Sequence, residues 1–480
     1  AGSTTGTVSF TPTDDSIYEG NETAIIAISS VTGEASESGT QAVTITITEN
    51  ESAPTVTLTT SATSIAENAG SSLTLTATLS GATNADVTVA LSTSGAATEG
   101  TDYTDGSGNI DDIVIAAGST TGTVSFTPSD DSVYEDDEAA TIAISSVSGG
   151  SATESGTQTV TITITDNESA GSVTLAVSAS SISENAGSSL TLTATLSSVS
   201  DEDVTVSLST SGTATEGTDY TDGSGNIDDI TISAGDTTGT VNFTPTDDST
   251  YEGNETATIA ISGVSGADAT ESGSQSVSVT ITENESAPTV TLTVSATSIA
   301  ENAGSSITVT ATLSGATDEN VTVGLSTSGT ATEGTDYTDG SGVVDDITIS
   351  AGSTTGTVNF TPTDDSVYEG NETAILSISS VSGGSATESG SQSKTITITD
   401  NESAPTVTLA TSATSIAENA GSSLTLTATL SVATTADVTV ALSTSGSATE
   451  GTDYTDGSGN VDDIVISAGS TTGTVSFTPT

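Results

Sequence analysis

The amino-acid sequence of this chain repeats itself with a period of 117 residues. Several short sequence motifs, which we call words, recur at that interval. The word ENAG starts at Glu67, Glu184, Glu301 and Glu418. The word EGTDYTDGSG recurs at the same interval, with its first aspartate at Asp102, Asp219, Asp336 and Asp453. Solenoid repeats have periods of about 20 to 50 residues, whereas about 100 to 150 residues is the usual size of an independent domain. The period therefore predicts a row of separate domains, like beads on a string.

The repeat also predicts domain limits. Three complete repeats are expected at 53–169, 170–286 and 287–403, with the C-terminal part of a repeat at 1–52 and the N-terminal part of another at 404–480. Residues 1–13 and 468–480 are both AGSTTGTVSFTPT, so we expect the chain to be a window on a longer array. Short junctions, three of them stiffened by Pro54, Pro288 or Pro405, should limit the swing of neighbouring domains.

Within each repeat, apolar residues alternate with Thr and Ser. In SLTLTATLS (72–80), Leu73, Leu75 and Leu79 fall on one face, and in QTVTITIT (158–165) Ile162 and Ile164 do the same. Such period-two runs, bounded by Gly, Ser, Asn and Asp, indicate strands. About seven short strands in a unit of this size are typical of the immunoglobulin sandwich. The sequence predicts an all-β chain of tandem immunoglobulin-like antiparallel β-sandwich domains.

Charge excludes several classes of function. The chain has 64 acidic residues and one basic residue, Lys394, for a net charge of -63. It cannot neutralise phosphates, so nucleic acid and anionic membrane surfaces are not expected partners. No apolar run reaches the 18 or so residues of a membrane span. His and Cys are absent, and the same paired carboxylates recur in every repeat, so we expect no enzyme.

The acidic residues gather in fixed words at strand ends. In the repeat 53–169 these words contain Glu67, Asp102, the pair Asp130 and Asp131, Glu135 and Glu138, and Asp166 with Asn167 and Glu168. So many carboxylates would repel one another unless a cation held them together. Ca²⁺ accepts six to eight or so oxygen ligands in flexible geometry, and a site with oxygen donors alone suits it best. The pattern predicts calcium as the cofactor.

The order of these words, ENAG, EGTDYT, AGSTTGTVSFTPSDDSVYEDDE and VTITITDNE, resembles the Calx-beta domain. That family includes regulatory domains of sodium–calcium exchangers and many large bacterial surface proteins, and its exchanger-type members bind Ca²⁺ at one end of the sandwich. The resemblance covers every repeat. It implies that the carboxylates in the same words are metal ligands.

The residues implied by the resemblance are these. In the repeat 53–169 they are Glu67, Asp102, Asp130, Asp131, Glu135, Glu138 and Asp166. In 170–286 they are Glu184, Asp219, Asp247, Asp248, Glu252, Glu255 and Glu283. In 287–403 they are Glu301, Asp336, Asp364, Asp365, Glu369, Glu372 and Asp400. In the two partial repeats they are Asp14, Asp15, Glu19, Glu22 and Glu49, and Glu418 and Asp453.

The words depart from the family at some positions. Ser132, Ser249 and Ser366 stand where the family has a third aspartate after the pair, which implies fewer ions per site or weaker binding. Asp111 and Asp112 lie in what looks like an insertion, where solvated loop charges are the expected reading and an extra ion site the alternative. Tyr134 is expected to serve in packing rather than as a binding platform.

Uniform repeats favour a mechanical role. We expect an extracellular or cell-surface structural protein, a filament or the stalk of an adhesin, in which Ca²⁺ at domain ends and junctions makes the array stiff. Self-association into a fibre, dependent on calcium, is the expected further contact. The alternative is an adhesion module that recognises a ligand under calcium control.

Overall fold

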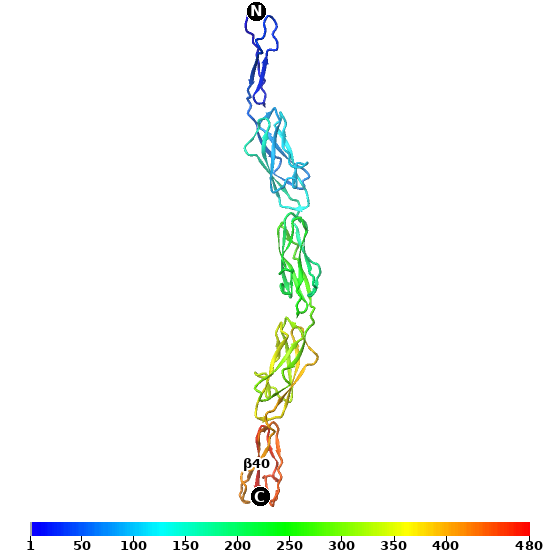
Figure 1. The fold of residues 1–480 in the computed structure, drawn as a ribbon, viewed down its shortest axis with the longest axis vertical. Helices are drawn as coiled ribbons and strands as arrows, with labels where there is room; N and C mark the ends of the chain where they lie inside the picture. Colours follow the sequence, from blue (N-terminus) through cyan, green and yellow to red (C-terminus); the bar gives the residue numbers. More distant parts are fainter. Residues whose placement is uncertain (1) are drawn as a thin grey trace.

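The computed structural model describes residues 2–480, which form a row of β-sheet bodies along one axis, with the termini at opposite ends of a long rod (Figure 1). Every regular element among these residues is a strand. The described part of the chain therefore contains no helix that could cross a membrane. This arrangement confirms the expected all-β fold and its beads-on-a-string organisation.

The strand bounds repeat from body to body. The first complete repeat has β4 (Thr55–Thr60), β5 (Ser64–Ala66), β6 (Leu73–Leu79), β7 (Ala82–Thr83), β8 (Val87–Gly95), β9 (Tyr103–Thr104), β10 (Ile113–Ile115), β11 (Thr121–Pro128), β12 (Val133–Tyr134), β13 (Glu138–Ser148), β14 (Thr153–Glu154) and β15 (Thr159–Thr165). The second has β16 (Ser172–Val177), β17 (Ser181–Ser183), β18 (Leu190–Leu196), β19 (Val199–Ser200), β20 (Val204–Gly212), β21 (Tyr220–Thr221), β22 (Ile230–Ile232), β23 (Thr238–Pro245), β24 (Thr250–Tyr251), β25 (Glu255–Ser265), β26 (Thr270–Glu271) and β27 (Ser276–Thr282). The third has β28 (Thr289–Val294), β29 (Ser298–Ala300), β30 (Ile307–Leu313), β31 (Ala316–Thr317), β32 (Val321–Gly329), β33 (Tyr337–Thr338), β34 (Ile347–Ile349), β35 (Thr355–Pro362), β36 (Val367–Tyr368), β37 (Glu372–Ser382), β38 (Thr387–Glu388) and β39 (Ser393–Thr399).

The two ends of the chain carry fewer strands. The N-terminal part has β1 (Ile17–Tyr18), β2 (Glu22–Ala27) and β3 (Ala42–Ile47). The C-terminal part has β40 (Val407–Thr411), β41 (Leu424–Leu430), β42 (Ala433–Thr434), β43 (Val438–Val440), β44 (Tyr454–Thr455), β45 (Ile464–Ile466) and β46 (Thr472–Pro479).

Each complete repeat is a sandwich of two five-stranded sheets. In the first, the strand orders are β10-β8-β13-β15-β5 and β14-β4-β6-β11-β9. The central pairs are antiparallel, as expected, but the edge strands β5 and β14 pair in parallel with β15 and β4. These two edges, together with the two-residue strands, had no clear alternation in the sequence, which is why fewer strands were expected.

The core lies between the two sheets and is built from the alternating residues. Leu75, Val89 and Ile142 are fully buried. Phe126 is also fully buried, and its ring stacks on that of Tyr103 with the centroids 4.6 Å apart. Aromatic pairs in this offset geometry contribute about 0.5 to 1.5 kcal/mol beyond the area they bury. One such pair recurs in each core and partly offsets the scarcity of large side chains.

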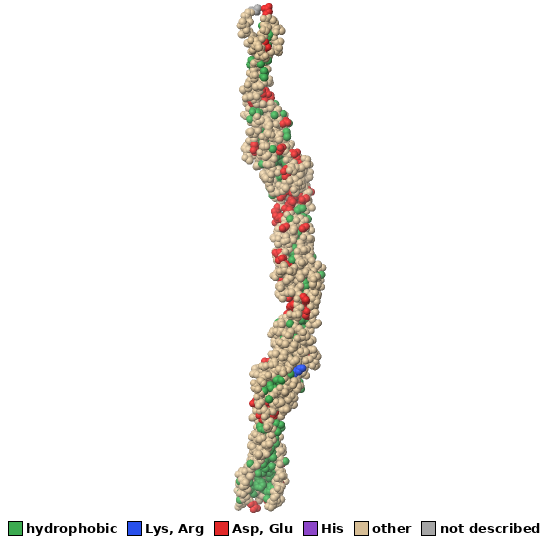
Figure 2. All heavy atoms as spheres, viewed as in Figure 1, with side chains coloured by type: hydrophobic (Ala, Val, Ile, Leu, Met, Phe, Trp, Pro, Cys, Tyr) green, Lys and Arg blue, Asp and Glu red, His purple; other side chains and the backbone are tan. Residues whose placement is uncertain are grey.

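The end segments hold only part of a sandwich. Ile26 in β2 is 45% exposed, although Ile142 at the same place in β13 is fully buried. Leu409 in β40 is 55% exposed, although its counterpart Leu58 is 5% exposed. Figure 2 shows hydrophobic side chains at the surface of the C-terminal end. The same words therefore bury their apolar residues only where both sheets are present.

Consecutive bodies touch through short parallel ladders. The strands β1, β12, β24 and β36, which we name the docking strands, pair with the receiving strands β7, β19, β31 and β42 of the following body. In the second of these junctions, Val133 lies opposite Val199 and Tyr134 opposite Ser200, whose side chain is buried. Tyr134 also packs against the hydrophobic core of the following repeat, which confirms its expected packing role.

Candidate functional site

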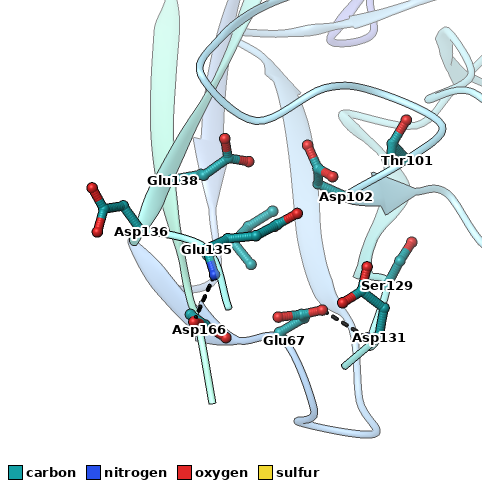
Figure 3. A pocket seen from close by; sticks show the side chains of 10 residues that line it. Glu67, Thr101, Asp102, Ser129, Asp131, Glu135, Asp136, Glu138 and Asp166 are labelled. Atoms are coloured by element: carbon teal, nitrogen blue, oxygen red, sulfur yellow. Dashed lines mark hydrogen bonds between the residues drawn. The ribbon is translucent and has the colours of Figure 1, made fainter. Parts of the chain in front are cut away.

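The acidic words converge on one end of each sandwich, the end that faces the next body. In the first complete repeat, Glu67 follows β5, Asp102 precedes β9, Glu135 follows the docking strand β12, Glu138 opens β13, and Asp166 follows β15. Figure 3 shows these side chains around one hollow, which they line together with Asp131 and Asp136. They meet there because strands of both sheets begin or end at this end of the sandwich.

Two groups of three carboxylates gather at this end of the sandwich. Glu67, Asp166 and Glu168 form one group, which we name the linker triad. Asp102, Glu135 and Glu138 form the other, the docking triad, because Glu135 directly follows the docking strand. In each triad, one carboxylate oxygen from every member lies within 4.8 Å of the others. That spacing is what a single cation needs to contact all three.

Backbone hydrogen bonds hold the linker triad in place. Glu67 is only 7% exposed, and its Oε1 accepts the N–H of Asp131 at 2.8 Å. Asp166 Oδ2 accepts the N–H of Glu135 at 3.0 Å, and its Oδ1 accepts the N–H of Glu168 at 2.9 Å. The Oε2 atom of Glu168 is buried without a hydrogen-bond partner. A buried carboxylate oxygen without a donor is costly, and a bound cation would satisfy it.

Crowding changes the acidity of the docking triad. Burial, and then the charges of Asp102 and other neighbours, raises the pKa of Glu135 to about 7. Burial and contact with Asp102 raise the pKa of Glu138 to about 7 as well. Burial also raises the pKa of Glu67, against the Asp131 hydrogen bond, which lowers it. Carboxyl groups that keep their protons near pH 7 do so because no positive charge nearby compensates the charge of the ionised form.

The arrangement recurs in the other complete repeats. The linker triads there are Glu184, Glu283 and Glu285, and Glu301, Asp400 and Glu402. Asp219, Glu252 and Glu255 form the second docking triad. The pKa of Glu369 and Glu372 is raised to about 7, first by burial and next by the charge of Asp336, so the same three positions of the third repeat also crowd together.

The aspartate pairs lie beside the triads and are not members of them. Asp131 lines the hollow, but its Oδ1 accepts the N–H of Val133 at 2.7 Å. Asp248 and Asp365 make the same contact with Thr250 and Val367. Asp130, Asp247 and Asp364 are not members of the triads named above. Asp130 is nevertheless near enough for its charge to raise the pKa of Glu67.

The partial repeats hold their expected residues in different states. Asp14, Asp15, Glu19, Glu22 and Glu49 line one hollow together with Glu51. Backbone N–H groups of Glu19 and Glu51 bound to Glu49 lower the pKa of that carboxyl to about 2. Glu418 and Asp453, by contrast, are exposed, and no later acidic word of their own repeat lies beside them.

One member of each linker triad was missing from the expected set of residues. Glu168, Glu285 and Glu402 complete the linker triads, yet only the first residue of each Asp-Asn-Glu or Glu-Asn-Glu word was expected to contribute. The sequence does show a second acidic residue in each of these words, two positions after the first. Its partnership depends on the turn after β15, in which the Glu168 N–H folds back onto Asp166.

The triads offer only carboxylate oxygens. Oxygen donors without nitrogen or sulfur suit a hard divalent cation, and several carboxylates with adaptable spacing suit Ca²⁺ better than the smaller Mg²⁺. The buried Oε2 of Glu168, which has no hydrogen-bond partner, and the raised pKa values of Glu135 and Glu138 are consistent with a site for Ca²⁺. Glu67, Asp166 and Glu168 would hold one cation, and Asp102, Glu135 and Glu138 another.

Comparisons with known proteins identify the family of the repeats. A family profile described as the Calx-beta domain matches residues 1–51, 49–168, 166–285, 283–402 and 400–476. No curated protein matches the chain. The calcium binding domain CBD12 of CALX1.1 is similar at 16% identity, over 46% of this chain and 96% of that chain, with a TM-score of 0.20.

Two further solved structures are also similar to this chain. Invasin, a bacterial integrin-binding protein, is 13% identical over 78% of this chain and 76% of its own, with a TM-score of 0.24. Domains 1–6 of the surface layer protein SbsC are 11% identical over 82% of this chain and 67% of that chain, with a TM-score of 0.19. At these values the structural neighbours carry no argument about function.

Proposed function

The chain belongs to the Calx-beta domain family, and from that membership we propose that it is a calcium-binding structural protein of the cell surface or extracellular space. Its working units are the repeats 53–169, 170–286 and 287–403, flanked by parts of repeats at 1–52 and 404–480. Each unit binds Ca²⁺ through the linker triad and the docking triad at the end that faces its successor.

The observation that carries the proposal is the pairing of two carboxylate triads at the ends of the first two complete sandwiches, with a linker triad and the crowded carboxyls of Glu369 and Glu372 at the third. Without cations, burial and the charges of neighbouring carboxylates raise the pKa of Glu135 and of Glu138 to about 7. Ions bound only by the folded state stabilise it by mass action, about 2.7 kcal/mol at a hundredfold excess over the dissociation constant. Calcium binding and folding are therefore coupled in each repeat.

The same ions stiffen the array. The linker triad includes Asp166 and Glu168, which lie in the segment leading to the next body, and the docking triad includes Glu135, which follows the docking strand. An ion in either triad thus restrains chain that leads to, or pairs with, the following repeat. We infer that calcium holds the rod straight, as a filament or as the stalk of an adhesin.

Uniformity favours a structural role over ligand recognition. The three complete repeats carry the same linker triad and the same docking contact, so no single repeat stands out as a recognition domain. An adhesion module regulated by calcium remains the second candidate. Contact between neighbouring rods through the polar, charge-poor sheet faces belongs to the same proposal, with calcium reducing the repulsion between them.

The test compares two variants with the same loss of charge. Glu67→Gln, Glu184→Gln and Glu301→Gln together remove one buried carboxylate from each linker triad but keep an acceptor for the N–H that Glu67 binds. The control replaces Asp86, Asp203 and Asp437 by Asn; these carboxylates accept backbone N–H groups at 2.8 Å away from the triads, and Asn320 makes the same contact naturally.

Isothermal titration calorimetry and small-angle X-ray scattering supply the two readouts. The wild type and the control should bind calcium and lose maximum dimension in excess chelator, whereas the Gln variant should bind fewer ions or bind them more weakly. Absence of calcium binding by the wild type would refute the proposed ligand sites. Binding without any change in maximum dimension would refute the stiffening role.

A further inference from the structure

The contact between consecutive bodies places one particular residue beside the calcium site of the preceding repeat. In the junction between 53–169 and 170–286, the N–H of Asp201 donates to the carbonyl of Tyr134 at 3.3 Å. Asp201 directly follows the receiving strand β19, and Tyr134 directly precedes Glu135 of the docking triad. The backbone ladder therefore brings a side chain of one repeat to the metal site of another.

The residue at this position differs along the chain. Asn84, Asp201, Asp318 and Thr435 follow the four receiving strands in the same register. The first three donate their N–H groups to the tyrosine carbonyl of the docking strand at 3.2, 3.3 and 3.4 Å. Two junctions thus present a carboxylate and two present a neutral side chain, on an otherwise constant backbone contact.

The carboxylates face like charges across the junction. The charge of Asp201 contributes to the raised pKa of both Glu135 and Glu138. The pKa of Asp201 is itself raised by burial and by Glu202, and further by Asp136 and Asp166 of the preceding repeat. Asp318 has the same relation to Asp219 and Glu283. Figure 2 shows the acidic side chains crowded together where the bodies coloured cyan and green in Figure 1 meet.

Opposite effects follow with and without the ion. When the docking triad is empty, the following repeat docks by pushing a carboxylate toward other carboxylates, which opposes the short two-residue ladder. When the triad holds Ca²⁺, the same carboxylate is attracted to the cation or binds it. Asn84 and Thr435 carry no charge, so this repulsion and this attraction are both absent at their junctions.

We propose that the residue after each receiving strand sets how strongly calcium controls that junction. Asp201 and Asp318 make their junctions the more strongly calcium-dependent ones, whereas the junctions with Asn84 and Thr435 depend less on the ion. The rod then has flexible points at defined places when calcium is withdrawn. This inference rests on the proposed calcium binding and adds the partner residue that each site finds in the next repeat.

The chain provides its own matched junctions for a distance measurement. It has no cysteine, so pairs of cysteines can carry spin labels without background. Exposed Thr161 and Thr231 span the junction with Asp201, and Thr395 and Val465 occupy the equivalent strand positions across the junction with Thr435. Pulsed electron paramagnetic resonance on the full chain, with Ca²⁺ and with chelator, gives the distance distribution for each pair.

Removing calcium should broaden the distribution at the Asp201 junction more than at the Thr435 junction. Asp201→Asn, which introduces the residue natural at position 84, should reduce the broadening to that of the Thr435 junction, and Thr435→Asp should increase it at the other junction. The control Asp203→Asn removes the same charge two residues away, where Asn320 is natural in the next repeat, and should leave the calcium response intact.

Three results would overturn the inference. Equal broadening at both junctions, or an unchanged response in Asp201→Asn, would show that the ladder and not the side chain decides. An equal effect of Asp203→Asn would assign the response to net charge. Calorimetry on the same labelled chains separates these results from failure of the proposed function, because an absence of calcium binding would refute both.

Discussion

In chelator, the folded protein should lose stability as the pH rises from 5 to 8. The carboxyls of Glu135 and Glu138 have a pKa of about 7 in the folded protein, and that of an unperturbed glutamate is 4.5. Between these values the folded state binds more protons than the unfolded state. Linkage then requires the free energy of unfolding to fall with rising pH. The stabilising protonation is complete below about pH 4.5 and is lost as the pH passes through about 7.

The size of the effect follows from the pKa difference. A shift of one pKa unit corresponds to about 1.4 kcal/mol, so the shift from 4.5 to about 7 would be equivalent to roughly 3 kcal/mol for each carboxyl if solvent did not screen it. Both side chains are partly exposed, and screening by solvent reduces this to about 1 kcal/mol each. Two carboxyls then contribute about 2 kcal/mol per repeat, equivalent to roughly 6 to 10 °C in the melting temperature of a domain of this size.

Scanning calorimetry at pH 5, 6, 7 and 8 measures this directly. In chelator the melting temperature should fall along the series. In saturating Ca²⁺ it should rise, because calcium requires the ionised carboxylates and competes with protons for them. The combined substitutions Glu135→Gln, Glu252→Gln and Glu369→Gln should reduce the dependence of the melting temperature on pH in chelator, since the pKa of each of these carboxyls is raised to about 7. A melting temperature in chelator that is constant or rises between pH 5 and 8 would refute the reasoning.

Two further predictions concern the sandwich itself. Phe126→Ala should destabilise its repeat by about 3 to 5 kcal/mol, because it leaves a cavity beside Tyr103 in a fully buried core; calorimetry should show one early transition, and a loss below 1 kcal/mol or so would contradict the packing. Gly95→Ala should also destabilise that repeat, since Gly95 has a φ of 127° and an added Cβ would lie 2.0 Å from the carbonyl oxygen of Ala139. Gly81→Ala, with no atom within 4 Å of its added Cβ, is the control and should change the melting temperature little.

Much of the architecture could be predicted from the repeat and the alternation of residues. Leu75, Leu79 and Ile162 were expected to face one side of a strand, and all three are buried in the sandwich. This prediction succeeds because alternation along a strand is a local property of the backbone, and only one face of each sheet is packed. Expected calcium ligands such as Glu67 and Glu138 also lie at one end, because each word marks a strand terminus.

The grouping of the carboxylates was decided by the tertiary structure. Sequence spacing could not show that Asp102 belongs with Glu138 while Glu67 belongs with Asp166 and Glu168, because that division depends on which strand ends meet across the two sheets. The edge strands β5 and β14 escaped for a related reason, since their pairing in parallel with β15 and β4 depends on the order of the sheets.

The sequence by itself determined the repeating unit, its central strands and the acidic motifs at the strand ends. These properties are written in short words, each read from neighbouring residues. Only the tertiary structure decided how one repeat meets the next, with Tyr134 packed on the following core and Asp201 brought beside Glu135. That contact joins residues more than sixty positions apart through a ladder of two residues, and it depends on the relative placement of two folded bodies, which no local pattern encodes.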